Sequence, residues 1–151
     1  MKKLLLLLLA VFALSTNAQE IKKTDYIVES MTGLRMGVTT VKENGEILRK
    51  EYFSYMPTTN QFDEGMTIAQ SNNADDFLKQ LEKLKELILK LEKGESINLD
   101  LNRTVKKDTI LGVKVLWISG DGQAGVAQLN EGQINKLIDK LNKWTIKQQK
   151  N

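Results

Sequence analysis

Several short runs of the chain alternate apolar and polar residues, the pattern of half-buried β-strands. These runs are rich in β-branched and aromatic residues, and Asn44-Gly45 separates two of them. An Asn-Gly pair in this setting favours a tight hairpin, because both central residues of a type I′ turn need positive φ. In the first half of the chain we expect strands at residues 24–30, 34–43, 46–56 and 66–70.

Between residues 73 and 94 the apolar period changes to that of an α-helix. Asn72 or Asn73 is predicted to cap the start, and Gly94 to occupy the C′ position. The same spacing also fits two heptads of a coiled coil, but two leucines widen the stripe, which favours packing on a sheet. The apolar stripe consists of Phe77, Leu78, Leu81, Leu84, Leu87, Ile88 and Leu91.

The second half repeats this order of elements. Asn130 is a plausible cap for a final helix at residues 130–147, whose apolar face is Ile134, Leu137, Ile138 and Leu141. The strand at 111–119 is apolar on both alternating faces, as expected of a central strand. The strands expected in this half cover residues 95–102, 103–110, 111–119 and 124–129.

A series of strands followed by a helix occurs twice along the chain. This order predicts an α+β fold, in which an antiparallel sheet has two helices packed on one face. Residues 19–151 are expected to form a single domain of this class. The halves, 24–94 and 95–148, also suggest a duplicated β-rich-then-helix unit, because Ala69-Gln70 recurs as Ala127-Gln128.

Residues 1–18 have the features of a secretory signal peptide: two lysines, an apolar run from Leu4 to Leu14, and small residues up to Ala18. As a helix the run rises about 16 Å, about half of the hydrocarbon thickness of a bilayer. We therefore expect cleavage after Ala18, a periplasmic or secreted product and no membrane span. With no cysteine at the cleavage site, no lipid anchor is expected.

Composition narrows the chemistry. The formal charge of +3 falls by two without Lys2 and Lys3, and both signs are interspersed, so nucleic acid is not an expected partner. The chain contains 0 histidines and 0 cysteines, which excludes Ser/His/Asp triads, Cys/His dyads and disulfide staples. We expect no cofactor and no metal site.

The segment from Gly120 to Gly125, GDGQAG, has the spacing of a dinucleotide-binding turn. That function requires its last glycine to open a helix within a βαβ unit. Here Gly125 precedes an extended run, and the helix is expected only near Asn130. We therefore predict a β-turn centred on Asp121-Gly122 and no phosphate site.

Two acidic pairs could serve as the carboxylates of a hydrolase, Asp63-Glu64 and Asp75-Asp76. The first pair is also explained by solvation of a loop. The second pair is also explained by the positive end of the helix dipole.

The aromatic residues offer the best candidates for binding. Trp117 is expected in the core, and Trp144 is expected to pack the last helix against the sheet. In the run YFSYM, aromatic residues lie on both faces of one strand, so we expect one of these faces to be exposed to solvent. Tyr52 and Tyr55 are therefore the predicted binding residues.

The end of the leader, NAQ, the Lys/Asn/Ile-rich body and the lack of cysteine resemble small uncharacterised exported proteins of Bacteroidetes-type bacteria. The resemblance implies an exported location and transfers no site. Our leading hypothesis is a non-enzymatic binding module of the cell envelope with a protein or small-molecule partner. A small-ligand carrier with a cavity between sheet and helices, and a carboxylate-based hydrolase, are the alternatives.

Overall fold

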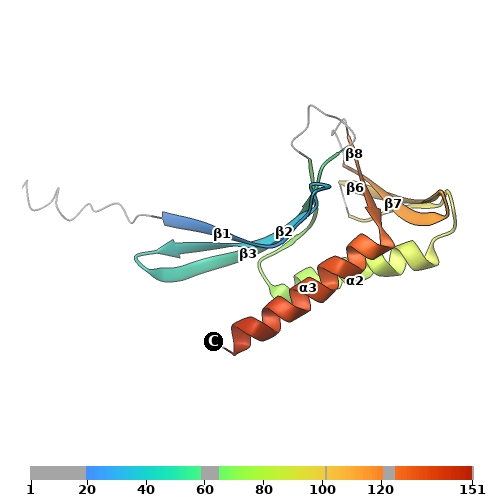
Figure 1. Cartoon of the computed structure of the whole chain (residues 1–151). Coiled ribbons are helices and arrows are strands. Elements are labelled where there is room, and N and C mark those ends of the chain that lie inside the picture. Colours follow the sequence, from blue (N-terminus) through green and yellow to red (C-terminus); the bar gives the residue numbers. More distant parts are fainter. Residues whose placement is uncertain (1–19, 59–64, 101, 121–124, 151) are drawn as a thin grey trace, which may run out of the picture.

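The computed structural model describes residues 20–58, 65–100, 102–120 and 125–150, and Figure 1 shows an α+β fold. The first half contains β1 (Glu20–Glu29), β2 (Arg35–Glu43), β3 (Glu46–Met56), β4 (Met66–Ser71) and helix α2 (Ala74–Lys90). The second half contains β5 (Ser96–Asn98), β6 (Arg103–Ile110), β7 (Val113–Gly120), β8 (Val126–Asn130) and helix α3 (Glu131–Gln149). Both helices lie on the same side of the strands.

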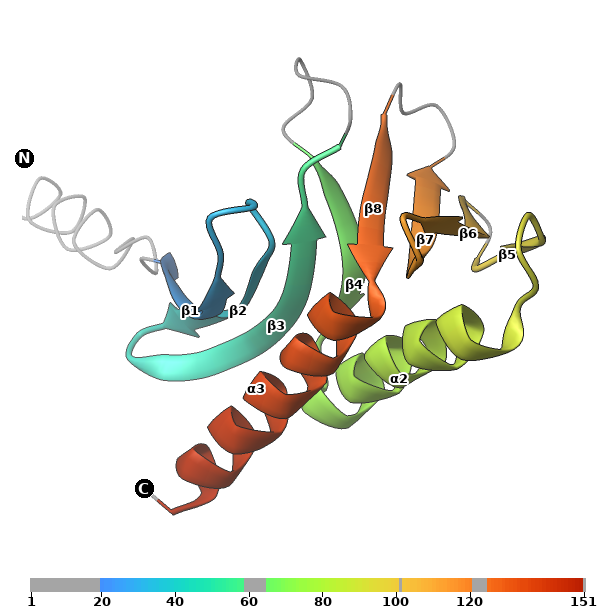
Figure 2. The same ribbon diagram turned by 45° about the vertical axis from the view of Figure 1, so that its right-hand side comes forward.

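The α+β class with antiparallel strands is confirmed, and the strands divide into two four-stranded sheets instead of one. Each sheet has its strands in chain order, β1-β2-β3-β4 and β5-β6-β7-β8. The last strands, β4 and β8, lie next to each other (Figure 2). Within the described residues, one antiparallel bridge links the two halves, from Thr58 just after β3 to Ala127 of β8.

The two halves repeat one topology, a four-stranded antiparallel meander followed by a helix. The β2–β3 hairpin turns at Asn44-Gly45, with φ values of 53° and 87°, as the sequence predicts. The β6–β7 hairpin turns at Leu111-Gly112, with φ values of 49° and 82°. In both hairpins, two consecutive turn residues therefore adopt the left-handed conformation, although leucine rarely does so.

Side chains at the helix starts satisfy backbone N–H groups that have no partner inside the helix. Asn73, and not Asn72, caps α2: its Oδ1 accepts from the N–H groups of Asp75 at 2.8 Å and Asp76 at 3.3 Å. Asn130 caps α3 in a capping box with Gln133. Both helix starts lie where the sequence predicts them.

The end of α2 differs from the prediction, because the helix stops at Lys90 and Gly94 is not its C′ residue. The buried Lys107 of β6 donates from Nζ to the carbonyl oxygen of Leu91, where a cation complements the negative end of the helix dipole. Gly94, at φ 88°, lies in the following turn and donates to the carbonyl oxygen of Lys107. Strand β6 therefore contacts the C-terminal end of this helix and the turn after it.

One apolar core lies between the sheets and the helices. Alternate residues of β2, β3, β7 and β8 point into it, and the predicted stripe of α2 fills its centre. That stripe packs against strands and α3 within the chain, so the sheet-packing alternative is confirmed over the coiled coil. The largest fully buried side chains are Phe77, Leu34, Met36, Ile68, Leu81, Leu84, Ile88, Leu116, Ile118, Leu129, Ile134 and Leu137.

The two tryptophans have different surroundings. Trp144 packs against the core as predicted, with its ring 6.1 Å from that of Tyr52 at 83°. The prediction that Trp117 is a core residue is wrong: it lies on the interior strand β7 but alternates with the buried Leu116 and Ile118. It therefore points to the outer face of the second sheet, where it is partly exposed.

The glycine-rich segment leads into a strand and not into a helix. Gly125 precedes β8, and α3 begins only at Glu131. The expected turn at Asp121-Gly122 lies outside the described residues. The dinucleotide alternative therefore lacks the helix N-terminus that it requires directly after the last glycine.

We predict that Asn73→Ala lowers the free energy of unfolding by about 1 kcal/mol, because two N–H groups of α2 lose their acceptor. The matched control is Asn72→Ala, at the exposed neighbouring position, which should change stability by less than about 0.5 kcal/mol. Urea unfolding followed by circular dichroism measures both. Equal losses in the two variants would contradict the assignment of the cap.

Candidate functional site

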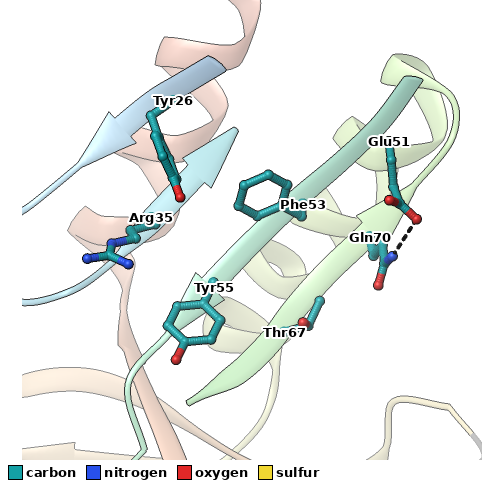
Figure 3. A pocket seen from close by; sticks show the side chains of 7 residues that line it. All are labelled: Tyr26, Arg35, Glu51, Phe53, Tyr55, Thr67 and Gln70. Carbon is teal, nitrogen blue, oxygen red and sulfur yellow. Dashed lines mark hydrogen bonds between the residues drawn. The ribbon is translucent and has the colours of Figure 1, made fainter. Parts of the chain in front are cut away.

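The outer face of the first sheet, which points away from the helices, carries a hollow of about 570 Å³. Figure 3 shows its side chains, which come from all four strands of this sheet. Its volume lies within the range of about 300–1,000 Å³ that is usual for small-molecule sites. The hollow is open to solvent and is lined by Tyr26, Arg35, Glu51, Phe53, Tyr55, Thr67 and Gln70.

A glycine lets the two aromatic rings at one end of the hollow meet. Gly37 of β2 lies between Tyr26 of β1 and Phe53 of β3 in the strand register. A Cβ atom at Gly37 would lie 2.8 Å from the carbonyl oxygen of Asp25 and 3.0 Å from Cζ of Phe53. Because this side chain is absent, the Phe53 ring extends across β2 and meets the Tyr26 ring edge to face, at 6.1 Å and 86°.

A second close approach of a ring to a glycine fixes Tyr55. Its ring covers Gly65, where a Cβ atom would lie 2.4 Å from the phenol oxygen. Gly65 has a φ of 112°, which side chains rarely tolerate. Next to Tyr55 in the register, Arg35 pairs with Glu29 at 3.3 Å.

A bulge in β4 supplies the polar wall of the hollow. The register between β3 and β4 shifts at Ile68, so Ile68 and Ala69 are both buried, and Thr67 and Gln70 both point outward. The amide of Gln70 donates to Oε1 of Glu51 at 3.0 Å. Without the shift, strict alternation would place Thr67 and Gln70 on opposite faces.

The outer edge of β4 is closed by side chains from other elements. Arg103 of β6 donates from Nη1 to the carbonyl oxygens of Thr67 at 3.1 Å and Ile68 at 2.5 Å. Gln80 of α2 bonds the backbone N–H and the carbonyl of Gln70, at 3.1 Å and 2.8 Å. These contacts hold the bulge and protect a sheet edge that would otherwise be free to pair with another chain.

An acidic residue holds the Arg103 guanidinium in place. Nε of Arg103 donates to Oδ2 of Asp100 at 2.7 Å. This hydrogen bond lowers the pKa of Asp100 below its usual value, and burial opposes it more weakly. The charged pair therefore links the turn after β5 to the edge of β4.

The structure separates the two predicted binding residues. Tyr55 lies in the hollow, whereas Tyr52 is 7% exposed and packs on Phe77, with ring centroids 6.0 Å apart. Burial raises the pKa of Tyr52, and the carboxylate of Asp75 raises it further. Tyr52 therefore belongs to the core, and the partner contact predicted for YFSYM remains with Tyr55.

Sequence reasoning missed most of the hollow. Tyr26 is 52% exposed and lies on the same face as Phe53, but these residues are far apart in sequence. The run YFSYM contains no decisive signal, because Tyr52, Ser54 and Met56 alternate with Phe53 and Tyr55, so both faces carry aromatic rings. The face that is buried is the one that includes Ser54.

The acidic pairs do not converge within the described residues. Asp75 and Asp76 lie in the first turn of α2, and Asp76 pairs with Lys79 at 2.9 Å. Asp63 and Glu64 lie outside the described residues. Over the ranges that the structure describes, no group of three His, Cys, Asp or Glu side chains is arranged to hold a metal ion.

A smaller hollow of about 310 Å³ lies between α2 and the edge of β4. Because it lies between a sheet and a helix, this hollow is the one that best matches, among the described residues, the cavity that the carrier hypothesis requires. Ile68, Leu84 and Leu99 are its apolar lining. Its polar groups, among them Gln80 and Arg103, already bond the backbone of β4, so it provides fewer free polar groups than the outer hollow.

Comparisons with family models, with curated proteins and with solved structures found no match to this chain. Among the described helices, neither has the length and apolar character needed to cross a membrane. The fold and the site thus define an α+β protein whose open aromatic hollow lies on the outer face of a sheet.

We predict that part of the tyrosine ionisation is delayed to above the usual pH range, because the pKa of Tyr52 is raised. A raised pKa contributes stability that is present below the unfolded-state pKa and is lost as the pH rises through the folded-state pKa. Ultraviolet absorbance during alkaline titration should show the delayed phase in the wild type and not in Tyr52→Phe. A delayed phase that persists in Tyr52→Phe would show that it belongs to another tyrosine.

Proposed function

We propose that this protein is an exported, non-enzymatic binding module of the cell envelope that contacts its ligand through the outer face of β1–β4. The observation that carries the proposal is the hollow on that face. Three aromatic rings there, from Tyr26, Phe53 and Tyr55, contribute little to the core and remain accessible. Aromatic and arginine side chains are enriched at recognition surfaces.

The polar lining of the hollow supports binding better than hydrolysis. Among its described lining residues, Glu51 supplies the one carboxylate, and that group already accepts from Gln70. Most glycoside hydrolases place two carboxyl groups about 5–9 Å apart across the bond that they cleave. A fixed carboxylate–amide pair beside aromatic rings is suited to orienting a ligand by hydrogen bonds.

Export is proposed from the leader. Two lysines, a short apolar run and the small residues Thr16 and Ala18 match the three parts of a signal peptide. Proteins of the envelope meet partners at a surface, where an open hollow is accessible to a large ligand. The location and the site thus support the same function.

The binding proposal predicts that the purified protein is retained on washed cell envelopes through the hollow. The double variant Phe53→Ser/Tyr55→Ser should reduce the retained fraction by about tenfold, equivalent to about 1.4 kcal/mol. The matched control is Trp117→Ser, which removes an aromatic side chain from the outer face of the other sheet. Sedimentation of envelopes with bound protein measures retention, and equal losses in both variants would contradict a site at the hollow.

The export proposal predicts a mature product that starts at Gln19. Ala18→Arg should block cleavage and leave the precursor, because signal peptidases require small residues at this position. Asn17→Gln is the control, since the intervening position is not read in the same way. Mass spectrometry of the fractionated protein distinguishes the two products, and an exported Ala18→Arg product that starts at Gln19 would refute this cleavage site.

A further inference from the structure

We propose that the ligand of the outer hollow is a neutral saccharide chain, which stacks on Phe53 and Tyr55 and is hydrogen-bonded by the polar wall of β4 and β3. This inference rests on the proposed function, because it names the ligand class of the same site. It follows from the arrangement of the two walls, from their free polar atoms and from their charge.

The two walls differ in chemistry in the way that a sugar ring requires. Phe53 and Tyr55 lie two residues apart on the same face of β3, which places them about 7 Å apart along the strand. Their rings lie in the middle of the lining, with Thr67, Gln70 and Glu51 on one side and Tyr26 and Arg35 on the other (Figure 3). A pyranose presents an apolar C–H face and a rim of hydroxyl groups, so it can satisfy both walls at once.

The polar wall keeps groups available for hydroxyls. The Gln70–Glu51 hydrogen bond uses one N–H and one carboxylate oxygen. Over the described residues, the second oxygen of Glu51 and the side-chain carbonyl oxygen of Gln70 have no other hydrogen bond. The existing bond restrains the two side chains, so these acceptors and the remaining Gln70 N–H are partly oriented before a ligand arrives.

The charge of the hollow favours an uncharged ligand. It is lined by one cation, Arg35, and one anion, Glu51. Arg35 also pairs with Glu29 at 3.3 Å, so an anionic ligand would have to compete with that carboxylate. An anionic ligand would meet Glu51 and a cationic ligand would meet Arg35, whereas a polyhydroxylated ligand can bond to both groups.

The shape of the hollow favours a chain over a small molecule or a proline-rich peptide. The hollow is open to solvent, so a small ligand would remain partly in solvent, while a chain can continue past it. Proline-rich peptides bind in grooves between aromatic side chains. Here the Tyr26 and Phe53 rings contact each other edge to face, which leaves no slot between them.

The test is titration of the purified protein with neutral linear hexasaccharides of glucose, mannose, galactose and N-acetylglucosamine, in α- and β-linked forms, followed by NMR and calorimetry. We expect at least one to shift the Gln70 side-chain amide and the ring signals of Phe53 and Tyr55 in the wild type. Tyr55→Leu and Phe53→Leu keep apolar bulk but lose the flat ring, and should raise Kd by about tenfold or more.

Trp117→Leu is the matched control and should leave Kd within about twofold. A parallel titration uses proline-rich and β-strand decapeptides. Peptide binding at Phe53 and Tyr55 without saccharide binding would overturn the saccharide inference and leave the proposed binding function standing. If neither class shifts these signals, both proposals fail, and because this comparison needs only the wild type, it stands even if a variant does not fold.

Discussion

The structure depends on a core that neither half can complete alone. Helix α2 follows β4 in the chain but also contacts β7, and α3 follows β8 but also contacts β1. Each helix therefore covers part of the other half's sheet, and the buried cluster contains residues of all these elements. A four-stranded sheet with one helix would leave apolar inner-face residues such as Met36 or Ile118 in water. The two repeated units thus share one apolar core.

The two helices cover the inner faces of both sheets and leave both outer faces free. Contacts where the two sheets meet determine which side chains lie on the outer face of the first sheet. Arg103 and Gln80 form hydrogen bonds with the backbone at the edge of β4, so these backbone groups are satisfied without a fifth strand in this sheet. The bulge that they stabilise turns Gln70 to the side of Phe53. A contact that secures the fold therefore also positions the proposed site, and loosening Arg103 would disturb both.

Local signals predicted most of the elements, because they depend on residues close in sequence. The 3.6-residue period located both helices, side-chain acceptors located Asn73 and Asn130, and the Asn44-Gly45 pair located a hairpin. What could not be predicted depends on residues that are distant in sequence. Trp117 looks like core in a strand that is apolar on both faces, and only the packing of Leu116 and Ile118 on the helices shows which face is outside. The division into two sheets has no local signal either.

The hollow arises from differences between the two halves and not from their similarity. In both sheets the third strand presents an aromatic residue beside a glutamine of the fourth, Phe53 beside Gln70 and Trp117 beside Gln128. On the other side of the aromatic residue, the first sheet has Gly37 and the second has Lys106. A glycine lets the Phe53 ring lie down across β2, whereas a lysine side chain occupies the corresponding place next to Trp117. This one position without a side chain, together with the bulge in β4, therefore distinguishes the outer face of the first sheet from that of the second.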